Sequence, residues 1–185
     1  MKNNILLLVV KSLLVMVFMA GYLQANQEQV ITVAMIEEAQ ENWGDGLVLI
    51  STTHREGGDA KAAAETMLQT LYFYPEGKVL FKPTLTSGDT VFRPTYEGAL
   101  SYFVGGNPRF PSDRGFALSP FVGHRSEIDS LIIKGNVAIV MGNVWLKTPD
   151  GDEIKVDKTF AYTLDDNGNL RIITHHSSLP VKEDN

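Results

Sequence analysis

The sequence predicts an α+β fold in one domain, with helices first and an antiparallel sheet afterwards. Apolar residues in the first half recur every three to four positions, which is typical of amphipathic helices. In the last third, the dipeptides Gly135-Asn136, Asp150-Gly151 and Asn167-Gly168 separate stretches rich in β-branched residues, as in β-hairpins. We find no internal repeat and no low-complexity linker, so helices packed on a single sheet are the expected architecture.

The first 25 residues predict a secretory signal peptide. Lys2 precedes a mostly apolar stretch, and Ala25 is followed by polar residues, so cleavage is expected after Ala25. The alternative is an uncleaved membrane anchor, which would place Lys11 near the bilayer centre at a cost of about 3 kcal/mol. We therefore expect a signal peptide over 1–25, a single domain over 26–185, no stable membrane anchor, and a periplasmic or secreted protein.

Composition excludes several classes of function. The chain has 16 basic and 22 acidic side chains, a net charge of −6, and loss of the two lysines in the leader would make it −8. With no basic run to offset this charge, nucleic acid is not expected as a partner. The absence of cysteine excludes disulfides, thiolate catalysis and zinc–thiolate sites. Stability must come from the apolar core, for which about 160 residues are sufficient.

Two helices are expected in the first part of the mature chain. The first covers 30–43 and is expected to end at Gly44 and Gly46, before an apolar stretch over 47–50. A break at Gly57 and Gly58 precedes the second helix, which covers 59–72 and begins with Asp59 as a capping residue. The expected buried residues of the second helix are Ala63, Met67, Leu68 and Leu71.

The middle of the chain mixes short elements with a long connection. Short strands are expected over 79–81 and 90–93, and a helix over 96–104 that ends at two glycines. The connection 107–123 contains three prolines, and loops of this length tend to be functional or mobile. Together with His124, this connection is a candidate to gate a pocket or to lie at a dimer interface.

Four long strands are expected over 124–134, 137–147, 154–164 and 170–178. Because alternate residues of a strand share a face, His175 should lie with Ser177 and Ile173, and His176 with Thr174 and Ser178. One of these two sets should point into the curved side of the sheet. The plainer interpretation is that both histidines are ordinary strand residues, one buried and hydrogen bonded and the other exposed to solvent.

A metal site built by the protein is not favoured. His175 and His176 point to opposite faces of one strand, so they cannot easily bind the same ion. The remaining histidines, His54 and His124, show no spacing typical of metal ligands. No cofactor is expected, although zinc stays open as an alternative.

Several sequence strings resemble iota-class carbonic anhydrases. The strongest is HHSSLP at 175–180, followed by VDKTF at 156–160 and LRI at 170–172. The strings LFKPT at 80–84 and SYFVGG at 101–106 extend the likeness, so that it covers about 68–181. These enzymes are related to the association domain of calcium/calmodulin-dependent protein kinase II. They share its cone-shaped, nuclear-transport-factor-like (cystatin-like) fold.

The resemblance implies reversible hydration of carbon dioxide to bicarbonate without an obligatory metal. It places the reaction in a small pocket inside the cone, in a homodimer formed across the sheet. It places Thr84, Tyr102, His175 and Ser177 at the site. The three hydroxyls would hold a water and stabilise the developing charge, and His175 would accept a proton. Without the resemblance, Thr84 is a strand-end hydroxyl and Tyr102 an amphipathic helix residue with its ring in the core.

Two other classes of function use the same fold. One is a non-catalytic module that binds a small ligand or drives oligomerisation, and the absence of hydratase activity in a folded protein would favour it. The other is an isomerase or cyclase, which generally needs a carboxylate or a His–Asp pair as its base. Asp157 is the acidic residue expected beside the pocket, at the end of a hairpin.

Overall fold

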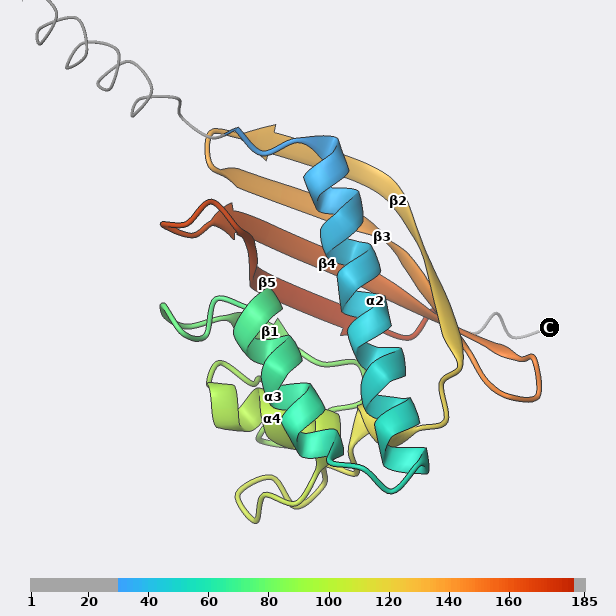
Figure 1. Ribbon diagram of the computed structural model, residues 1–185. Helices are drawn as coiled ribbons and strands as arrows, with labels where there is room; N and C mark the ends of the chain where they lie inside the picture. The colour runs from blue at the N-terminus through green and yellow to red at the C-terminus, as the bar shows by residue number, and fades with distance from the viewer. Residues whose placement is uncertain (1–29, 182–185) are drawn as a thin grey trace, which may run out of the picture. The chain divides into compact units, whose positions relative to one another are not determined.

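The computed structural model describes residues 30–181, and the expected leader lies outside them. Figure 1 shows helices on one face of a single twisted sheet, which is the α+β architecture that the sequence predicts. None of the helices within 30–181 combines the length and the apolar character needed to span a membrane. The helices are α2 (Val33–Arg55), α3 (Ala60–Leu71) and α4 (Tyr96–Val104), with a short 3-10 helix at Phe116–Leu118.

The sheet has five strands in the order β1-β5-β4-β3-β2. β1 pairs in parallel with β5, and the other neighbours are antiparallel, so the sheet is mostly antiparallel as expected. This parallel contact matters for the site, because it brings the residues that follow β1 beside the end of β5. The strand bounds are β1 Leu80–Lys82, β2 Gly123–Lys134, β3 Val137–Lys147, β4 Glu153–Leu164 and β5 Leu170–Ser178.

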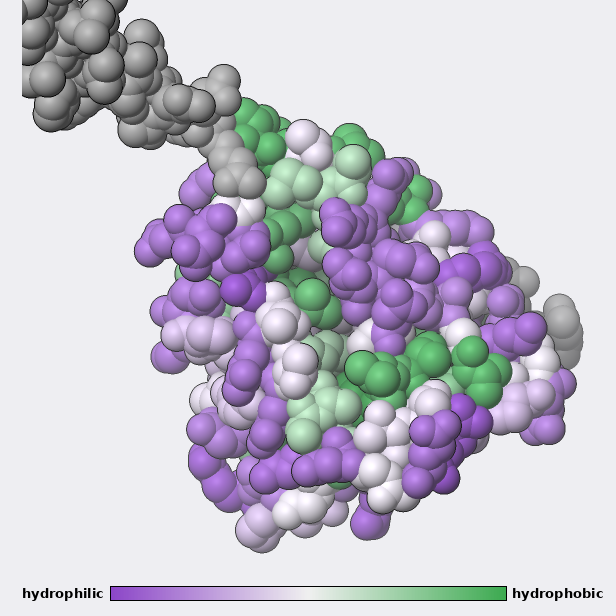
Figure 2. Space-filling model, in the orientation of Figure 1, coloured by the Kyte–Doolittle hydropathy of each residue, from purple (hydrophilic) through white to green (hydrophobic). Residues whose placement is uncertain are grey.

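The apolar core lies between the helices and the sheet. Trp43, Leu47 and Ile50 of α2 are buried there against aromatic residues of the strands, among them Phe160 and Tyr162. Hydrophilic side chains make up most of the helix-bearing face in Figure 2, with hydrophobic ones in smaller areas. The apolar side of α2 is therefore turned toward the sheet, as its periodicity predicts.

α2 is longer than the sequence predicts, because it passes through Gly44 and Gly46 without a break. These glycines permit close packing. A Cβ atom at Gly44 would lie 2.2 Å from Nδ1 of His124, and one at Gly46 would lie 2.8 Å from Sδ of Met67. The expected helix end at residue 43 and the separate stretch 47–50 are thus wrong. Packing against β2 and α3 outweighs the poor helix propensity of glycine, about 1 kcal/mol per residue.

The other helices follow their sequence cues closely. Asp59 caps α3 by accepting a hydrogen bond from Ala62 N at 2.9 Å, and Thr95 caps α4 in the same way. α4 ends at Gly105, whose φ of 70° is readily adopted only by glycine. On α3, Met67 and Leu68 are buried as expected, whereas Ala63 and Leu71 are half-buried.

The expected strand over 90–93 does not form. Arg93 N donates to Phe81 O at 2.8 Å, but no ladder follows from this contact. Pro94 comes next and has no N–H to continue a ladder. The Arg93 side chain instead turns into the protein and forms an ion pair with Asp113.

β5 contains an irregularity that changes which residues face the core. Ala161 pairs with Thr174 while Tyr162 pairs with Ile172, so Ile173 is an extra residue on β5. Such a bulge resets the alternation of side chains. Ile172 and His175 are therefore both buried, and Ile173 does not share the inward face of His175 as predicted. Beyond the bulge the alternation holds, and Ser177 is buried on the same face as His175.

Candidate active site

Two hydroxyls from distant parts of the chain meet at the carboxyl end of β5. Thr84 follows β1 and Ser177 lies in β5, and their side-chain oxygens are 2.6 Å apart. The parallel pairing of β1 with β5, in which Lys82 is opposite His176, brings the two segments together. Lys82 also donates from Nζ to the backbone oxygen of Ser177 at 2.9 Å. Either hydroxyl can donate or accept, so the pair can hold a water or an oxygen of a ligand.

Tyr102 of α4 brings a third hydroxyl to the same place. Its side chain is buried, and its Oη has no hydrogen-bond partner. Burial raises the pKa of Tyr102 to about 12, and the nearby Thr84 hydroxyl opposes this shift. The phenol is therefore neutral at ordinary pH and has a proton to donate. Buried polar groups are nearly always paired, so an unpaired hydroxyl here is unusual. It indicates a place where a ligand or a water would supply the partner.

A cavity of about 350 Å³ opens beside Tyr102. Part of its wall comes from the long connection after α4, including Arg114 and Phe116, and the opposite part from Leu85 beside Thr84. Phe116 stacks on the Tyr102 ring with 5.4 Å between centroids. The connection that the sequence left as a gate or an interface thus contributes to the wall of this cavity.

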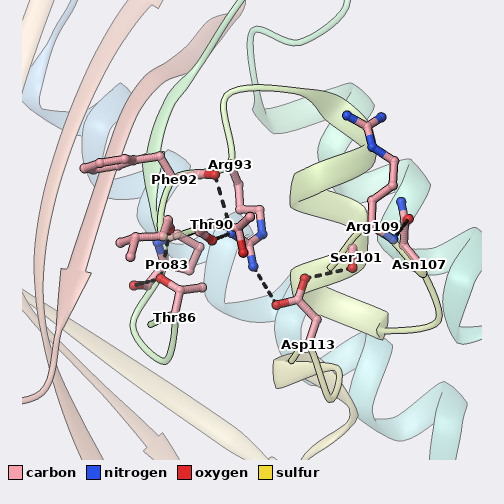
Figure 3. Close-up of polar contacts among 10 residues, drawn as sticks. Pro83, Thr86, Thr90, Phe92, Arg93, Ser101, Asn107, Arg109 and Asp113 are labelled. Carbon is pink, nitrogen blue, oxygen red and sulfur yellow. Dashed lines mark hydrogen bonds and ion pairs between the residues drawn. The ribbon is translucent and has the colours of Figure 1, made fainter. Parts of the chain in front are cut away.

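Asp113 fastens this wall by an ion pair with Arg93, which precedes α4, and by a hydrogen bond from Ser101 of α4, as Figure 3 shows. Arg93 Nη2 lies 2.8 Å from Asp113 Oδ1, and Ser101 donates to Asp113 Oδ2 at 2.7 Å. The Arg93 and Asp113 side chains are 0% and 3% exposed. The Arg93 guanidinium also donates to the Thr90 carbonyl and lies 4.4 Å from the centroid of the Phe110 ring. Sequence patterns did not predict this pair, because its members are separated by a whole helix.

His175 is deeply buried, and both of its ring nitrogens are occupied. Nδ1 lies 2.9 Å from Tyr72 Oη, and Nε2 lies 2.9 Å from Lys158 Nζ. The ring lies 4.6 Å from the centroids of both Phe81 and Phe160. His175 therefore shares a strand face with Ser177, but it bonds to a tyrosine and a lysine and not to the three hydroxyls.

The hydrogen bonds around His175 continue as a chain. Trp43 donates from Nε1 to Tyr72 Oη at 2.8 Å, and Tyr72 contacts His175 on its other side. Lys158 Nζ lies 4.2 Å from the centroid of the Trp43 ring. The chain Trp43–Tyr72–His175–Lys158 thus joins α2, the end of α3, β5 and β4.

Burial governs the charges in this chain. It lowers the pKa of His175 well below the usual value, with a further lowering from the neighbouring Lys158. It also lowers the pKa of Lys158 well below that of an exposed lysine, and raises that of Tyr72. No carboxylate within residues 30–181 forms an ion pair with Lys158. Burial therefore disfavours the charged forms of His175 and Lys158 and the ionised form of Tyr72.

Sequence reasoning missed three members of this hydrogen-bonded chain: Trp43, Tyr72 and Lys158. Lys158 had a usable cue, since it lies between Val156 and Phe160 at the inward positions of a strand. A lysine there is unusual, because lysine is almost never fully buried without a partner. Trp43 and Tyr72 are the last residues of the two expected helices, and nothing in their local pattern indicates a hydrogen-bond role.

Other acidic and histidine residues lie away from this pocket. Asp157 alternates with the inward residues of β4 and accepts a hydrogen bond from Asn143 at 2.7 Å, so it is not placed as a base in the pocket. His176 is exposed, on the face opposite His175. Glu41, Asp45 and His124 offer three possible metal-ligating atoms within 4.8 Å of one another, between α2 and β2. Sequence spacing gave no indication of this group, and none of the three lines the cavity beside Tyr102.

Comparison with known proteins gives a consistent picture. A family model described as metal-independent carbonic anhydrase matches residues 34–179. A relative from Nostoc sp. (strain PCC 7120), named metal-independent carbonic anhydrase, is 47% identical over 155 residues, which cover 83% of this chain and 76% of the relative.

Solved structures agree with these matches. The crystal structure of a cyanobacterial iota-carbonic anhydrase complexed with bicarbonate is 46% identical, with a TM-score of 0.82, and the match covers 84% of this chain and 96% of that one. A dehydratase-like member of the nuclear-transport-factor-2-like family from Streptomyces avermitilis is 11% identical with a TM-score of 0.52. That match covers 81% of this chain and 96% of the other, and it supports the fold alone.

Proposed function

The chain belongs to the metal-independent carbonic anhydrase family, and we propose that it hydrates carbon dioxide reversibly to bicarbonate in the pocket around Thr84, Tyr102 and Ser177. The observation that carries this proposal is the 46% identity to an iota-carbonic anhydrase solved with bicarbonate. The hydroxyl pair and the unpartnered Tyr102 hydroxyl give the reaction a place in this chain.

The three hydroxyls have complementary roles in this proposal. Thr84 and Ser177 hold the attacking water, because each can accept one of its hydrogens or donate to its oxygen. As the water oxygen bonds to carbon, negative charge develops on the carbon dioxide oxygens. Tyr102 donates its hydrogen to that charge from a fixed, buried position, where such a hydrogen bond is strongest. No metal ion is required to polarise the substrate.

Aromatic walls suit a substrate without charge. Phe81, Phe103 and Phe160 are all buried. They pack around Tyr102 and His175, with Phe81 5.7 Å from the Tyr102 ring centroid. Carbon dioxide enters such a dry surface readily, whereas the anionic product is destabilised there unless it is hydrogen bonded.

His175 contributes to proton acceptance as part of a hydrogen-bonded group. Both of its nitrogens contact protein atoms, so it has no free nitrogen with which to take a proton directly from water. Its burial on the same strand face as Ser177 supports a place for it close to the proposed water.

Assembly and location complete the proposal. A homodimer across the sheet is supported by exposed apolar side chains on β2 and β3: Ile132 is 64% exposed and Met141 is 55% exposed. Ile132 pairs with Ile139, which is 44% exposed, so they form one apolar patch that a second copy would cover.

Export to the periplasm or beyond, after cleavage near Ala25, is supported by the basic and apolar leader.

The activity is tested by stopped-flow hydration of carbon dioxide with a pH indicator. The protein is treated with a chelator beforehand, because the Glu41–Asp45–His124 group could hold a stray ion. We expect hydration far above the uncatalysed rate, unchanged by chelation. A folded protein without hydration or bicarbonate dehydration would refute the proposal, and activity that returned only with added zinc would refute its metal-independent part.

A further inference from the structure

Lys158 is a buried amine with no anion to balance it. Its residue is 5% exposed, and its Nζ contacts the neutral His175 and the face of Trp43. A buried lysine without a carboxylate costs stability, because desolvation disfavours its charged form. A hydrocarbon side chain would fill this space at lower cost, so a role in chemistry is the better explanation for a lysine here.

The register of the sheet places Lys158 next to the proposed reaction centre. Lys158 and Ser177 are direct partners on β4 and β5, and both side chains are buried. Cβ atoms of such opposed residues lie about 5 Å apart. His175, which contacts the amine, is two residues before Ser177 on the same face. The amine, the imidazole and the Ser177 hydroxyl thus lie on the same buried face of the sheet and, with Thr84, form one polar cluster.

The proposed reaction changes the charge of this cluster. Carbon dioxide and water are neutral, whereas bicarbonate is an anion, and an unbalanced anion between aromatic walls is costly. The Arg93 guanidinium does not offer this balance, because it is already paired with Asp113. Lys82 contacts the backbone oxygen of Ser177 from a half-buried position. Lys158 is the buried amine in the cluster whose charge can change with the reaction.

We propose that Lys158 takes up the proton released when water adds to carbon dioxide and holds it as the counter-charge of bicarbonate. The inference rests on the proposed function. The water oxygen forms a bond to carbon, one C=O electron pair moves to oxygen, one water O–H bond breaks, and the proton bonds to the Nζ lone pair. The cluster gains one positive charge while the substrate gains one negative charge, so the buried net charge is unchanged. Dehydration of bicarbonate runs the same step backward.

This role determines which atoms carry the hydrogens in the hydrogen-bonded chain Trp43–Tyr72–His175–Lys158. For its lone pair to be free, Lys158 must donate an N–H to His175 Nε2, so that His175 carries its own hydrogen on Nδ1. That hydrogen is donated to Tyr72 Oη, whose two lone pairs then accept from Trp43 and His175. A protonated Lys158 keeps the same bond to Nε2, so the proton is accepted without rearrangement of the chain.

The surroundings of Lys158 favour this exchange of charge. Lys158 contacts His175 of β5, which in turn contacts Tyr72 at the end of α3, and burial disfavours the charged forms of both; Lys82 contacts the backbone oxygen of Ser177. Burial lowers the pKa of Lys158, so the amine is free to accept a proton when the pocket holds no anion. Bicarbonate beside it raises that pKa again, since an opposite charge favours the protonated form.

Proton uptake on bicarbonate binding is the direct test. Binding of bicarbonate to the full mature protein is measured by titration calorimetry at one pH in buffers of different ionisation enthalpy. We expect about one proton taken up per bicarbonate bound by the wild-type protein, because an amine that starts neutral ends charged. Lys158→Gln, which keeps a hydrogen-bonding group but cannot take a proton, should bind more weakly and without uptake. Lys155→Gln, at an exposed position of the same strand, is the matched control and should behave like the wild type.

Hydration kinetics supply the second readout. In the wild type, kcat for hydration should rise with pH as Lys158 loses its proton. Lys158→Gln should be slower by about a hundredfold, and its kcat should no longer show this rise with pH. Should Lys158→Gln fail to fold, the wild-type calorimetry still decides. An active wild type that binds bicarbonate without proton uptake would overturn the assignment of Lys158 and leave the proposed function intact. A wild type that neither binds bicarbonate nor hydrates carbon dioxide would contradict the proposed function itself.

Discussion

Oγ1 of Thr84 and Oγ of Ser177 lie 2.6 Å apart although 93 residues separate them in the chain. Their contact depends on the parallel pairing of a three-residue strand, β1, with the last strand of the sheet. It also depends on the bulge at Ile173, which fixes the face that Ser177 presents. The proposed water site is thus a product of topology, with each hydroxyl held by backbone that other elements position.

Removal of the Ser177 hydroxyl should affect catalysis far more than folding. Ser177→Ala takes away one group that holds water while leaving the strand intact. Loss of one preorganised hydrogen-bonding group typically costs about 3 kcal/mol in the transition state, or about a hundredfold in kcat. Ser178→Ala is the control, since Ser178 lies on the opposite face of β5. Stopped-flow hydration should separate the two variants. Equal rates would mean that Ser177 does not hold the water, and a loss confined to Ser178→Ala would place the site on the other face.

Loss of the Asp113 carboxylate should destabilise the protein strongly. Asp113→Ala leaves the buried Arg93 guanidinium unpaired, which typically costs about 3–5 kcal/mol. The matched control is Glu153→Ala, which breaks the exposed pair with Arg125 and should cost less than about 1 kcal/mol. Urea unfolding measures both free energies. Similar losses would show that the Arg93–Asp113 pair does not hold the wall of the cavity.

Alanine at Gly44 should destabilise α2, although alanine is the better helix former. Its Cβ would meet the ring of His124, which has little room to move, at 2.2 Å. Overpacking of this kind costs about 1–3 kcal/mol. Gly46→Ala should be milder, because the contact there is with the flexible end of Met67. Thermal unfolding distinguishes this account from one in which the glycines merely weaken the helix, where both variants would raise the melting temperature.

Lys158 should make stability rise with pH in the window where the pH approaches the ordinary pKa of lysine, about 10.4. Its folded pKa is lowered, so in this window the unfolded chain binds a proton that the folded protein does not. The free energy of unfolding then increases with pH, by at most about 1.4 kcal/mol per unit for one proton. Lys158→Met should flatten this slope in denaturant unfolding measured across the window. An unchanged slope would mean that Lys158 is charged in the folded protein.

Local sequence cues were sufficient to predict the helix ends and turns that are stabilised by nearby residues. α4 begins and ends at the expected residues because Thr95 and Gly105 cap it, and the hairpin turns at Gly135, Gly151 and Gly168 lie where their dipeptides indicate. Each of these features depends on φ and on hydrogen bonds within a few residues, which is the information that a short window contains.

Tertiary contacts account for what could not be predicted. Gly44 looks like a helix terminus until His124 is placed against it. The bulge at Ile173 moves Ile172 to the inward face, and no single-strand pattern contains the register of β4. Thr84, Tyr102 and Ser177 were identified through resemblance to a family, and the contact of Thr84 with Ser177 follows from the sheet order. Lys158 lies at an inward position of β4, so its burial follows from the alternation of that strand, whereas its contact with His175 depends on the pairing of β4 with β5.

The most direct test of the pocket compares two buried tyrosines. Tyr102 and Tyr162 each have a buried hydroxyl without a hydrogen-bond partner, but only Tyr102 lines the cavity beside Thr84. Tyr102→Phe and Tyr162→Phe remove the same atom from similar surroundings, so kcat/KM for carbon dioxide hydration isolates the position. We predict a loss of about a hundredfold for Tyr102→Phe and less than about twofold for Tyr162→Phe. Equal values for the two variants, in proteins that remain folded and active, would contradict the placement of the reaction at Thr84, Tyr102 and Ser177.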